Sequence, residues 1–452
     1  MLSAASRAAR APGVDFGALR RREFGRLDAS GVAYLDYAAS ALYGASQLRA
    51  HFEQLEGGLF GNPHSDSAPS RASIDALARA RREVLRFFDV DESTHEVCFT
   101  ANTSAAVKLV AEGYPFGPRR GFVLSADNHN SVLGVREYAR RAGAPVTPLP
   151  LDADLRLSDP EARLAGARAK ARDGGLFAFP AQSNFSGVCH PLSLVRRARS
   201  LGFDVLVDVA AFAPSHPLSL RRCPADFAAL SFYKLFGYPT GLGALVARRE
   251  ALARLRRPWF AGGTVRYASV AAGTHRLHEG HEGFEDGTPD FLGLAALGPG
   301  FRLLDEVGMG ELGAHVARLT ARLLDGLSAL RHRGGAPLVR LYGPRDRARR
   351  GGTVAFNVCD RAGRLVPYPS VESLATRANI ALRGGCFCNP GAAEAALGLD
   401  PKRVGACLRD LGEGFSVGRF ASCLGGAVGA LRASLGLAND ERDVDRALEL
   451  VA

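Results

Sequence analysis

One lysine stands in a sequence context that suits covalent amine chemistry. Lys234 follows a short apolar stretch and lies between aromatic residues in Ser-Phe-Tyr-Lys-Leu-Phe-Gly, residues 231–237. Aromatic neighbours exclude water from an amine, which lowers its pKa and suits attack on a carbonyl group. A lysine that only lays its stem over the end of a strand has the same local sequence, so this segment alone leaves both interpretations open. The other lysines, Lys108, Lys170 and Lys402, have the surroundings of surface residues.

An acidic residue ends an apolar stretch some 26 residues before this lysine. The stretch, residues 205–208, predicts a buried strand whose last residue is Asp208. A carboxylate at the carboxyl end of a strand, followed by such a lysine, is what a pyridoxal phosphate site requires. The acid keeps the pyridinium nitrogen protonated, and the lysine carries the aldehyde as an imine. Taken alone, Asp208 could equally be a helix N-cap.

A third segment offers a place for the phosphate. A helix is expected over residues 103–112, directly after a strand expected at residues 97–100. Free backbone N–H groups and the helix dipole make such a helix start a site for an anion, and Thr103 and Ser104 add hydroxyl donors. No glycine signature of a P-loop accompanies it. The same hydroxyls could simply cap the helix, so this segment is weak on its own.

Two cysteines stand in a glycine-rich segment, Arg-Gly-Gly-Cys-Phe-Cys-Asn-Pro-Gly, residues 383–391. Glycines on both sides predict a flexible, exposed loop. A thiol near cationic groups in such a loop would have a lowered pKa and act as a nucleophile. The alternative is a pair of small buried residues. Arg383 and Arg432 could hold a substrate carboxylate by bidentate pairing, although surface placement is the alternative for each.

The elements that must position these residues alternate between strands and helices. Strands are expected at residues 97–100, 122–125, 176–180, 205–208, 228–231 and 244–246, and helices at 72–88, 103–112, 131–142 and 192–201. This alternation predicts a mostly parallel sheet covered on both faces. Ligands bind at the carboxyl ends of strands in such sheets, which is where the candidate residues cluster.

The alternation of short apolar strands and amphipathic helices stops after about residue 262. Residues 262–289 predict a loop, residues 291–330 a long helical stretch, and residues 353–358 a strand. We therefore expect a flexible tail at residues 1–14, a large domain at 46–305, and a small α+β domain made of 15–45 and 306–452. Residues 32–41 are expected to pack near the small domain. Three histidines in the predicted loop, His275, His278 and His281, are interpreted as solvent-exposed, and no metal site is predicted.

The composition is that of a globular protein. Of 452 residues, 47% are hydrophobic and 23% charged, and no apolar run reaches the roughly 20 residues of a membrane span. The 57 Lys and Arg exceed the 46 Asp and Glu, giving +11, but the two signs are mixed, so we expect no nucleic-acid partner. Eight irregularly spaced cysteines without a C-x-x-C pair predict reduced thiols, no structural zinc and a cytoplasmic location.

Several further motifs occur along the chain together with those above. They are Tyr-Leu-Asp-Tyr-Ala-Ala (34–39), Gly-Asn-Pro-His-Ser (61–65), Asp-Asn-His-Asn-Ser (127–131), Gln-Ser-Asn-Phe-Ser-Gly (182–187), residues 231–243, residues 260–265, Phe-Glu-Asp-Gly-Thr (284–288) and residues 383–391. In this order the chain resembles class V aminotransferase-fold enzymes, and more narrowly the desulfurase domain of molybdenum cofactor sulfurases. The resemblance implies the aspartate-aminotransferase-like fold of type I, and it runs from about residue 24 to the C-terminus.

The resemblance assigns a cofactor, pyridoxal 5′-phosphate, and residues to hold it. It implies that Lys234 is the Schiff-base lysine and that Asp208 pairs with the ring nitrogen. His129 would stack on the ring and shuttle protons, and Asn184 would bond the phenolic oxygen. The residues that would hold the phosphate are Thr103, Ser104 and Ser231, with Thr288 reaching the phosphate of a partner subunit. The last of these implies a homodimer.

The resemblance also implies a reaction. A cysteine desulfurase converts L-cysteine to L-alanine, and Cys388 rather than Cys386 matches the thiol that keeps the sulfur as a persulfide and passes it to an acceptor. Arg432 would bind the carboxylate of the substrate. The alternatives are an epimerase, a C–S lyase or an aminotransferase, none of which needs a nucleophilic thiol, and a catalytically silent scaffold protein.

The sequence departs from the family pattern at several positions. Gly384 replaces a threonine, Ala211 a glutamine, and Asn102 a glycine, the last being acceptable because asparagine tolerates a positive φ. Residues 415–429 are rich in glycine and alanine and lack a Cys-Gly-Asp stretch. The chain also ends soon after Arg432, before any domain that would bind the molybdenum cofactor. The resemblance therefore leaves the acceptor open, as the molybdenum cofactor or a protein.

Overall fold

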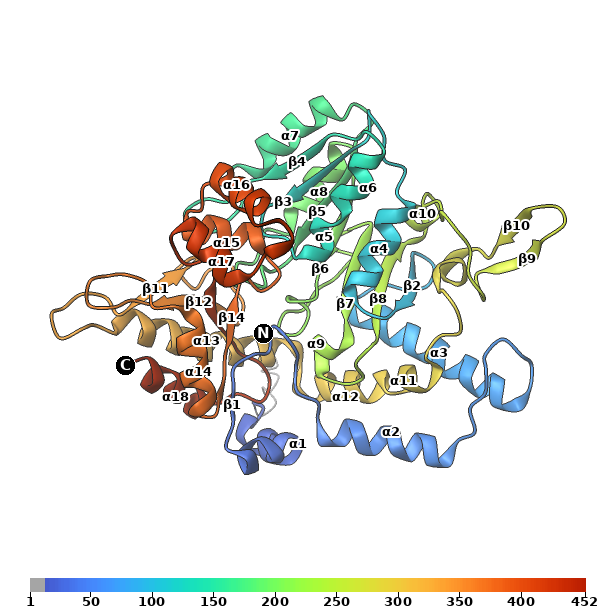
Figure 1. Cartoon of the computed structure of the whole chain (residues 1–452). Helices are drawn as coiled ribbons and strands as arrows, with labels where there is room; N and C mark the ends of the chain where they lie inside the picture. Colours follow the sequence, from blue (N-terminus) through green and yellow to red (C-terminus); the bar gives the residue numbers. More distant parts are fainter. Residues whose placement is uncertain (1–12) are drawn as a thin grey trace, which may run out of the picture.

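The computed structural model describes residues 13–452, so the tail predicted at residues 1–14 lies outside the described residues except for its last two. The chain forms a larger and a smaller lobe (Figure 1). The larger lobe is built on a seven-stranded sheet in the order β2-β8-β7-β6-β5-β3-β4. Its strands are β2 (His95–Thr100), β3 (Gly121–Ser125), β4 (Val146–Leu149), β5 (Gly175–Pro180), β6 (Phe203–Asp208), β7 (Phe227–Ser231) and β8 (Gly243–Arg248). Neighbouring strands are parallel, except that β8 is antiparallel to both β2 and β7.

Alternate residues of the central strands pack into opposite hydrophobic layers. In β5, Phe177 and Phe179 belong to one buried cluster and Leu176 and Ala178 to the other. The covering helices are α4 (Thr103–Gly113) and α6 (Val135–Arg141) on one face and α3 (Ala68–Phe87), α8 (Ser193–Ser200) and α12 (Leu297–Val307) on the other. Because both faces are covered, every residue of β5 is buried, which explains the continuous apolar stretches.

The predicted mostly parallel sheet is confirmed, and all six predicted strands are present. Of the seven strands of this sheet, β4 alone was missed by the sequence analysis. Its residues are half-buried or exposed except for Leu149, and it contains Pro148. A short edge strand of this kind carries neither an apolar run nor a clean alternation of polar and apolar residues.

The smaller lobe contains an antiparallel sheet in the order β11-β12-β15-β14. Its strands are β11 (Val339–Tyr342), β12 (Thr353–Val358), β14 (Arg383–Gly385) and β15 (Ala430–Ser434). A second, parallel pair joins β1 (Ala33–Tyr34) to β13 (Ile380–Ala381). The predicted packing of residues 32–41 beside the C-terminal elements is therefore confirmed, whereas the domain limits at residues 45 and 305 stay a prediction.

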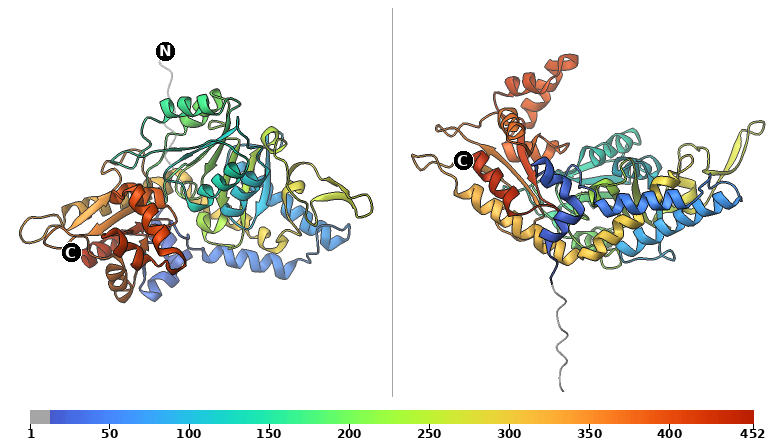
Figure 2. Two further views of the ribbon diagram at one scale, coloured as in Figure 1. Left: turned by 45° about the horizontal axis from the view of Figure 1, so that its top comes forward. Right: turned by 90° about the horizontal axis from the view of Figure 1, so that it is seen from below.

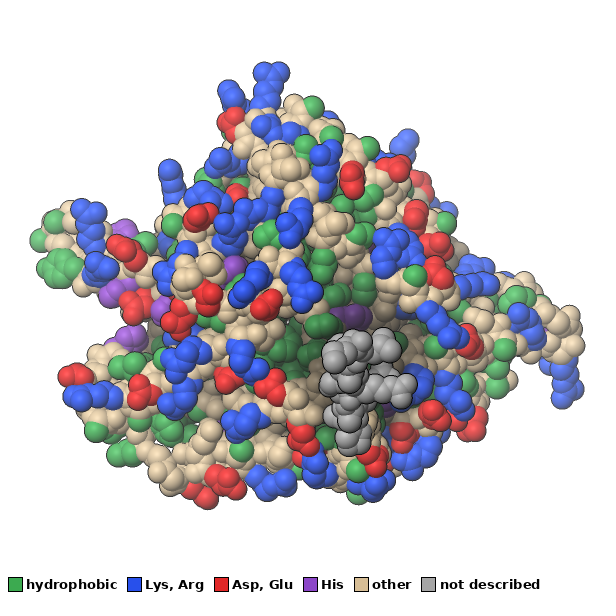
Figure 3. Space-filling model, turned by 180° about the vertical axis from the view of Figure 1, so that it is seen from behind, with side chains coloured by type: hydrophobic (Ala, Val, Ile, Leu, Met, Phe, Trp, Pro, Cys, Tyr) green, Lys and Arg blue, Asp and Glu red, His purple; other side chains and the backbone are tan. Residues whose placement is uncertain are grey.

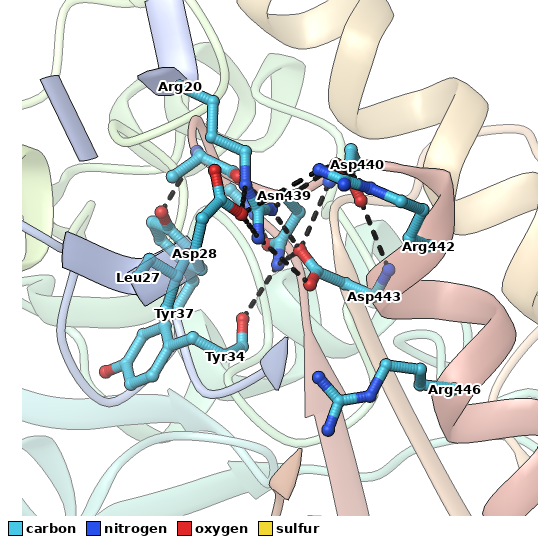
Figure 4. A network of polar contacts seen from close by, with 12 residues as sticks. Arg20, Leu27, Asp28, Tyr34, Tyr37, Asn439, Asp440, Arg442, Asp443 and Arg446 are labelled. Atoms are coloured by element: carbon cyan, nitrogen blue, oxygen red, sulfur yellow. Dashed lines mark hydrogen bonds and ion pairs between the residues drawn. The ribbon is translucent and has the colours of Figure 1, made fainter. Parts of the chain in front are cut away.

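Buried charges fix the N-terminal segment to the C-terminal one. Arg20, in α1 (Phe16–Ser30), donates to Asp28 Oδ1 at 2.9 Å and to Asp443 Oδ2 at 2.6 Å (Figure 4). Asn439 Nδ2 donates to the carbonyl oxygen of Tyr34 at 2.8 Å. Asp443 lies in α18 (Glu441–Val451), the last helix of the chain. The two ends of the chain thus stabilise each other around β1.

The prediction that residues 262–289 form a loop is wrong in part. It contains an antiparallel hairpin of β9 (Val265–Ser269) and β10 (Thr274–Leu277), followed by a 3₁₀ helix, Gly280–Phe284. The hairpin projects from the larger lobe (Figures 1 and 2). No residue of either strand is buried, so the hairpin has no apolar face by which a sequence pattern could reveal it.

The long helical stretch expected at residues 291–330 is divided into three helices. They are α11 (Phe291–Ala295), α12 (Leu297–Val307) and α13 (Met309–Ala329). The break between the last two falls at Gly308, whose φ of +76° suits glycine. The helix expected at residues 131–142 is likewise divided at Gly134, into α5 (Asn130–Leu133) and α6.

The expectation that all cysteines are reduced thiols is wrong for one pair. Cys407, in α16 (Pro401–Leu411), forms a disulfide with Cys423, in α17 (Val417–Leu424). The two helices pack against each other and bring Cα atoms from cysteines 16 positions apart to 6.0 Å. No local spacing rule identifies such a pair, because the helical hairpin that aligns it forms only on folding.

The surface carries both signs of charge. Basic and acidic side chains are interspersed over the face seen in Figure 3 rather than separated into single-sign regions. No helix within residues 13–452 is both long and apolar enough to cross a bilayer. The absence of a nucleic-acid partner stays a prediction.

Candidate active site

A cavity of about 320 Å³ opens beside the carboxyl ends of the central strands. Its walls come from the segments that follow β2, β3, β5, β6 and β7, as expected for a ligand site in a parallel sheet. Seven of the predicted site residues line it: Thr103, Ser104, His129, Asn184, Asp208, Ser231 and Lys234. Thr288, Arg383, Arg432 and Cys388 do not line this cavity.

Lys234 is held on α9 (Phe232–Phe236), a single turn of helix directly after β7. Its amine has no hydrogen-bond or ion-pair partner within residues 13–452. Burial lowers its pKa; the carboxylate of Asp208 opposes that effect, and the positive charge of Arg432 adds to it. A lowered pKa means that more of the amine is the nucleophilic free base at neutral pH. The interpretation as a surface lysine is excluded by this position.

Asp208 ends β6 and is 8% exposed. Its Oδ1 accepts a hydrogen bond from the backbone N–H of Ala210 at 2.9 Å. Among the described residues, its Oδ2 has no hydrogen-bond donor, although the residue lines the cavity. One carboxylate oxygen is thus fixed by the backbone, and the other is left for a cationic N–H of a ligand.

The start of α4 supplies hydroxyl groups to the same cavity. Ser231 Oγ accepts a hydrogen bond from the backbone N–H of Thr103 at 2.8 Å and lies 2.7 Å from Thr103 Oγ1. Ser104 Oγ lies 2.5 Å from Ser131 Oγ. The N-cap is Asn102, whose side chain accepts from Ala105 N at 3.0 Å. Helix capping therefore does not explain the hydroxyls of Thr103 and Ser104.

The expected reason for tolerating Asn102 is wrong. Its φ is −176°, which is extended backbone that any residue adopts, so no positive φ has to be accommodated. Asparagine fits here because its side chain caps α4. The glycine that the local geometry requires is Gly243 in β8, where a Cβ would come within 2.6 Å of Asn102 Cα.

His129 lines the cavity from the start of α5. Its Nδ1 accepts from the backbone N–H of Ser131 at 3.2 Å and lies 2.9 Å from Ser131 Oγ. In the neutral ring the proton is therefore on Nε2. Burial lowers the pKa of His129, and the nearby charge of Lys234 lowers it further, so the ring is neutral near pH 7.

Hydrogen bonds join the cysteine loop to the cavity wall, and its flexibility stays a prediction. Asn184 Nδ2 donates to the carbonyl oxygen of Phe387 at 2.7 Å. The backbone N–H of Asn130 donates to the carbonyl oxygen of Cys388, also at 2.7 Å. Asn389, which is fully buried, donates to Asp127 O at 2.7 Å and to Asn184 Oδ1 at 2.9 Å.

The exposure expected for the loop's thiols holds for Cys388, which is exposed, while Cys386 is half-buried. Both Phe387 and Cys388 have a positive φ, of 56° and 55°. Such strained backbone persists only where contacts hold it, and the hydrogen bonds to Asn184, Asn130 and Asp127 do so here. The motif at residues 182–187 pointed to Asn184 as a site residue. No feature of the sequence pointed to Asn389.

The two arginines expected at the substrate carboxylate lie side by side, but both are paired with a residue of the protein. Arg432 Nη2 lies 2.9 Å from Asp36 Oδ1, and Arg383 Nη2 lies 2.6 Å from Asp36 Oδ2. Arg432 Nη1 also donates to Asn184 O at 3.1 Å. The sequence analysis missed Asp36 as a site residue, although it stands in the motif at residues 34–39.

Thr288 is exposed and lies apart from the cavity of its own chain. The three histidines of the nearby segment are separate from one another in their contacts. His281 pairs with Glu96 at 2.8 Å and His278 with Glu282 at 3.1 Å, while His275 packs on Phe260. No group of metal-binding side chains is found among residues 13–452.

Comparison with known proteins identifies what this arrangement is similar to. The family model described as aminotransferase class-V matches residues 33–447. A molybdenum cofactor sulfurase from Solanum lycopersicum is 37% identical over 84% of this chain and 50% of its own length. One from Drosophila mojavensis is 36% identical over 96% of this chain and 59% of its own length. The chain thus spans between half and three fifths of these curated relatives.

Solved structures of similar fold come from desulfurases and a lyase. The apo structure of a cysteine desulfurase from Thermococcus onnurineus NA1 matches with a TM-score of 0.78 and 25% identity, covering 96% of both chains. The cysteine desulfurase CsdA from Escherichia coli matches with a TM-score of 0.76, covering 97% of this chain and 98% of its own, and at 23% identity it supports the fold alone. The cystine C-S lyase C-DES, in complex with cysteine persulfide, matches with a TM-score of 0.71 and 20% identity, covering 95% of this chain and 99% of its own.

Proposed function

Because this chain belongs to the aminotransferase class-V family, we propose that it is a cysteine desulfurase of the molybdenum cofactor sulfurase type. Its fold is the type I fold of pyridoxal-phosphate-dependent transferases, and its cofactor is pyridoxal phosphate. The observation that carries the proposal is the exposed thiol of Cys388 on a loop fixed to the wall of the cavity that contains Lys234. An epimerase or an aminotransferase has no use for such a thiol.

The residues of the cavity fit this cofactor. Lys234 has a free amine for its aldehyde, and Asp208 has an oxygen without a donor for its ring nitrogen. The hydroxyls of Thr103, Ser104 and Ser231 form a cluster at the N-terminus of α4, where a phosphate would also meet backbone N–H groups. When bound, pyridoxal phosphate supplies the electron sink that lets bonds at the amino acid's carbon atoms break.

We assign the reaction steps to the residues as follows. Lys234 would hold the cofactor through its Nζ, and as a free amine it takes up and returns protons at that atom. The Cys388 thiolate attacks the sulfur of L-cysteine, so that an S–S bond forms while the C–S bond breaks. The electron pair of the C–S bond stays with the carbon, which gains a proton. Cys388 thiol and L-cysteine thus give a Cys388 persulfide and L-alanine, with all atoms balanced.

A C–S lyase is the alternative that a structural neighbour raises. A lyase would release pyruvate and ammonia from L-cysteine, whereas a desulfurase releases alanine. We expect the holoenzyme, given L-cysteine and a reducing thiol, to form one alanine per sulfide and no pyruvate. Amino acid analysis and a lactate dehydrogenase assay for pyruvate measure both products. Pyruvate as the main product would overturn the proposal.

For the acceptor of the sulfur we propose only a chemical class. We propose a molecule that approaches the exposed side of Cys388, either the molybdenum cofactor or a protein thiol. The chain itself spans only part of the length of the sulfurases it resembles, so their complete activity is not carried over. A cytoplasmic location also stays a prediction.

We further propose a homodimer in which β9 and β10 contact the second subunit. A two-stranded hairpin is at best marginally stable in water by itself. This one carries Tyr267, 70% exposed, and ends beside Val270, which is fully exposed. The exposed Thr288 lies just after it in the chain, where it would reach a second subunit.

The dimer makes a direct prediction. The double substitution Tyr267→Asp with Val270→Asp places two charges in the interface, and we expect the mass to fall from twice 47.9 kDa to 47.9 kDa. Sedimentation equilibrium measures this. Leu374→Asp, an equally polar change at an exposed residue of the smaller lobe, is the matched control and should leave the mass unchanged. A wild-type protein that sediments as a monomer would contradict the proposal.

A further inference from the structure

Two arginines face each other across neighbouring strands at the edge of the active site. Arg383 in β14 and Arg432 in β15 are direct partners in the antiparallel ladder, so their side chains emerge on the same face. Like charges opposite each other in this way are destabilising unless they are compensated. The compensation comes from Asp36, whose Oδ2 accepts from Arg383 and whose Oδ1 accepts from both Arg432 and Arg383. Within this hydrogen-bonded cluster two positive charges therefore share one negative charge, and one positive charge is left over.

The surplus charge is located on a buried group. Arg432 is 2% exposed, and its Nε is buried without a hydrogen-bond partner among the described residues. Its guanidinium carbon lies 4.7 Å from the centre of the Phe387 ring, which belongs to the loop of Cys388. A buried donor without an acceptor destabilises the site, and an anionic ligand that accepted from it would relieve that cost.

This cluster is close to the reacting groups. The charges of both Arg432 and Arg383 lower the pKa of Lys234, which places them within electrostatic reach of its amine. Asn184, which lines the cavity, accepts a hydrogen bond from Arg432 through its carbonyl oxygen. A substrate attached through its amine to the site of Lys234 would therefore bring its carboxylate toward Arg432.

We propose that Asp36 determines the charge of the substrate, so that the site accepts an amino acid with one carboxylate and an uncharged side chain. This inference rests on the proposed function, because it assumes that an amino acid binds in this cavity. One carboxylate neutralises the single surplus charge of the cluster. A second acidic group on the substrate would have no cation of the cluster left to pair with it and would be repelled by the Asp36 carboxylate, which is costly in a buried site. L-cysteine, whose thiol is mostly uncharged at pH 7, meets the requirement.

The test compares two ligands of the same shape and different charge. L-aspartate and L-asparagine differ by one side-chain charge, and their dissociation constants are measured by calorimetric titration of the holoenzyme. We expect the wild type to prefer L-asparagine. Asp36→Asn keeps the shape of the side chain and removes its charge, and we expect the ratio of affinities to shift toward L-aspartate by about tenfold or more.

The ratio separates a charge effect from a structural one. If Asp36 only held the two arginines in place, its substitution would weaken both ligands together and leave the ratio unchanged, which would overturn the proposal. The double variant Asp36→Asn with Arg383→Gln restores a single surplus charge, and we expect its ratio to return toward the wild-type value. A double variant with the same ratio as Asp36→Asn alone would equally contradict the proposal.

Two further comparisons keep the result interpretable. Asp28→Asn removes a carboxylate that also pairs with an arginine, Arg20, away from the cavity, and should leave the ratio unchanged. If Asp36→Asn fails to fold, Arg383→Gln alone takes its place, and we expect it to shift the ratio further toward L-asparagine. Binding needs no turnover, so a shifted ratio in an enzyme that releases no alanine would refute the proposed reaction and retain this inference.

Discussion

Replacing Cys388 with alanine should abolish the release of alanine from L-cysteine while the protein keeps its bound cofactor. The thiol attacks the substrate sulfur in the proposed reaction, and no other exposed thiol is present in the described residues. Removal of a covalent nucleophile of this kind lowers the rate by about 10³-fold or more. Alanine formed at saturating cofactor and L-cysteine measures the effect, and the absorbance of the bound cofactor verifies that the site is intact.

Cys386→Ala is the matched control for this prediction. Cys386 lies two positions away in the same loop and is half-buried, so its loss should leave most of the activity. Equal alanine release from the Cys388→Ala variant and the wild type would show that Cys388 is not the nucleophile. Loss of activity in Cys386→Ala with retention in Cys388→Ala would transfer that role to Cys386.

The predicted residues that line the cavity share a simple physical origin. Asp208 ends a buried strand and Lys234 follows one, and parallel strands bring their carboxyl ends to one edge of the sheet. Their placement therefore follows from the order of strands along the chain, which the apolar stretches reveal. The same argument placed Thr103 and Ser104 at the start of α4.

The residues that the sequence did not locate depend on packing between distant segments. Asp36 lies 347 positions before Arg383 and 396 before Arg432, and only the folded smaller lobe brings the three together. The disulfide of Cys407 and Cys423 depends in the same way on two helices that turn back on each other. A single sequence holds no local pattern for such pairs.

Asn184 makes contacts beyond the one that the resemblance assigned to it. The resemblance assigned its amide to the cofactor ring, and the residue does line the cavity. Its Nδ2 also donates to Phe387 O, and its Oδ1 accepts from Asn389. An amide nitrogen carries two hydrogens, so one can hold the loop of Cys388 while the other remains for a ligand. Asn184 therefore connects the cavity to the loop of Cys388.

Replacing Lys234 with alanine should remove both the covalent bond to the cofactor and the activity. Lys234 is the only lysine among the residues that line the cavity, so no neighbouring amine can substitute for it. We expect alanine release to fall by about 10³-fold or more and the cofactor to be lost on dialysis. Lys170→Ala, at an exposed lysine of α7 (Pro160–Lys170), is the matched control and should retain both. A Lys234→Ala variant that keeps its cofactor through dialysis and borohydride reduction would show that another amine holds it.

The lowered pKa of Lys234 adds a pH dependence to this prediction. Burial disfavours the charged amine, so its titration is displaced below the ordinary lysine value of 10.5. The free base attacks the aldehyde, and the rate at which the apoprotein captures pyridoxal phosphate should therefore rise with pH through a midpoint below 10.5. Asp208→Asn removes the carboxylate that opposes this shift, so we expect the midpoint to fall further. Stopped-flow absorbance follows the capture, and a midpoint at or above 10.5 in the wild type would mean that the amine is solvated rather than buried.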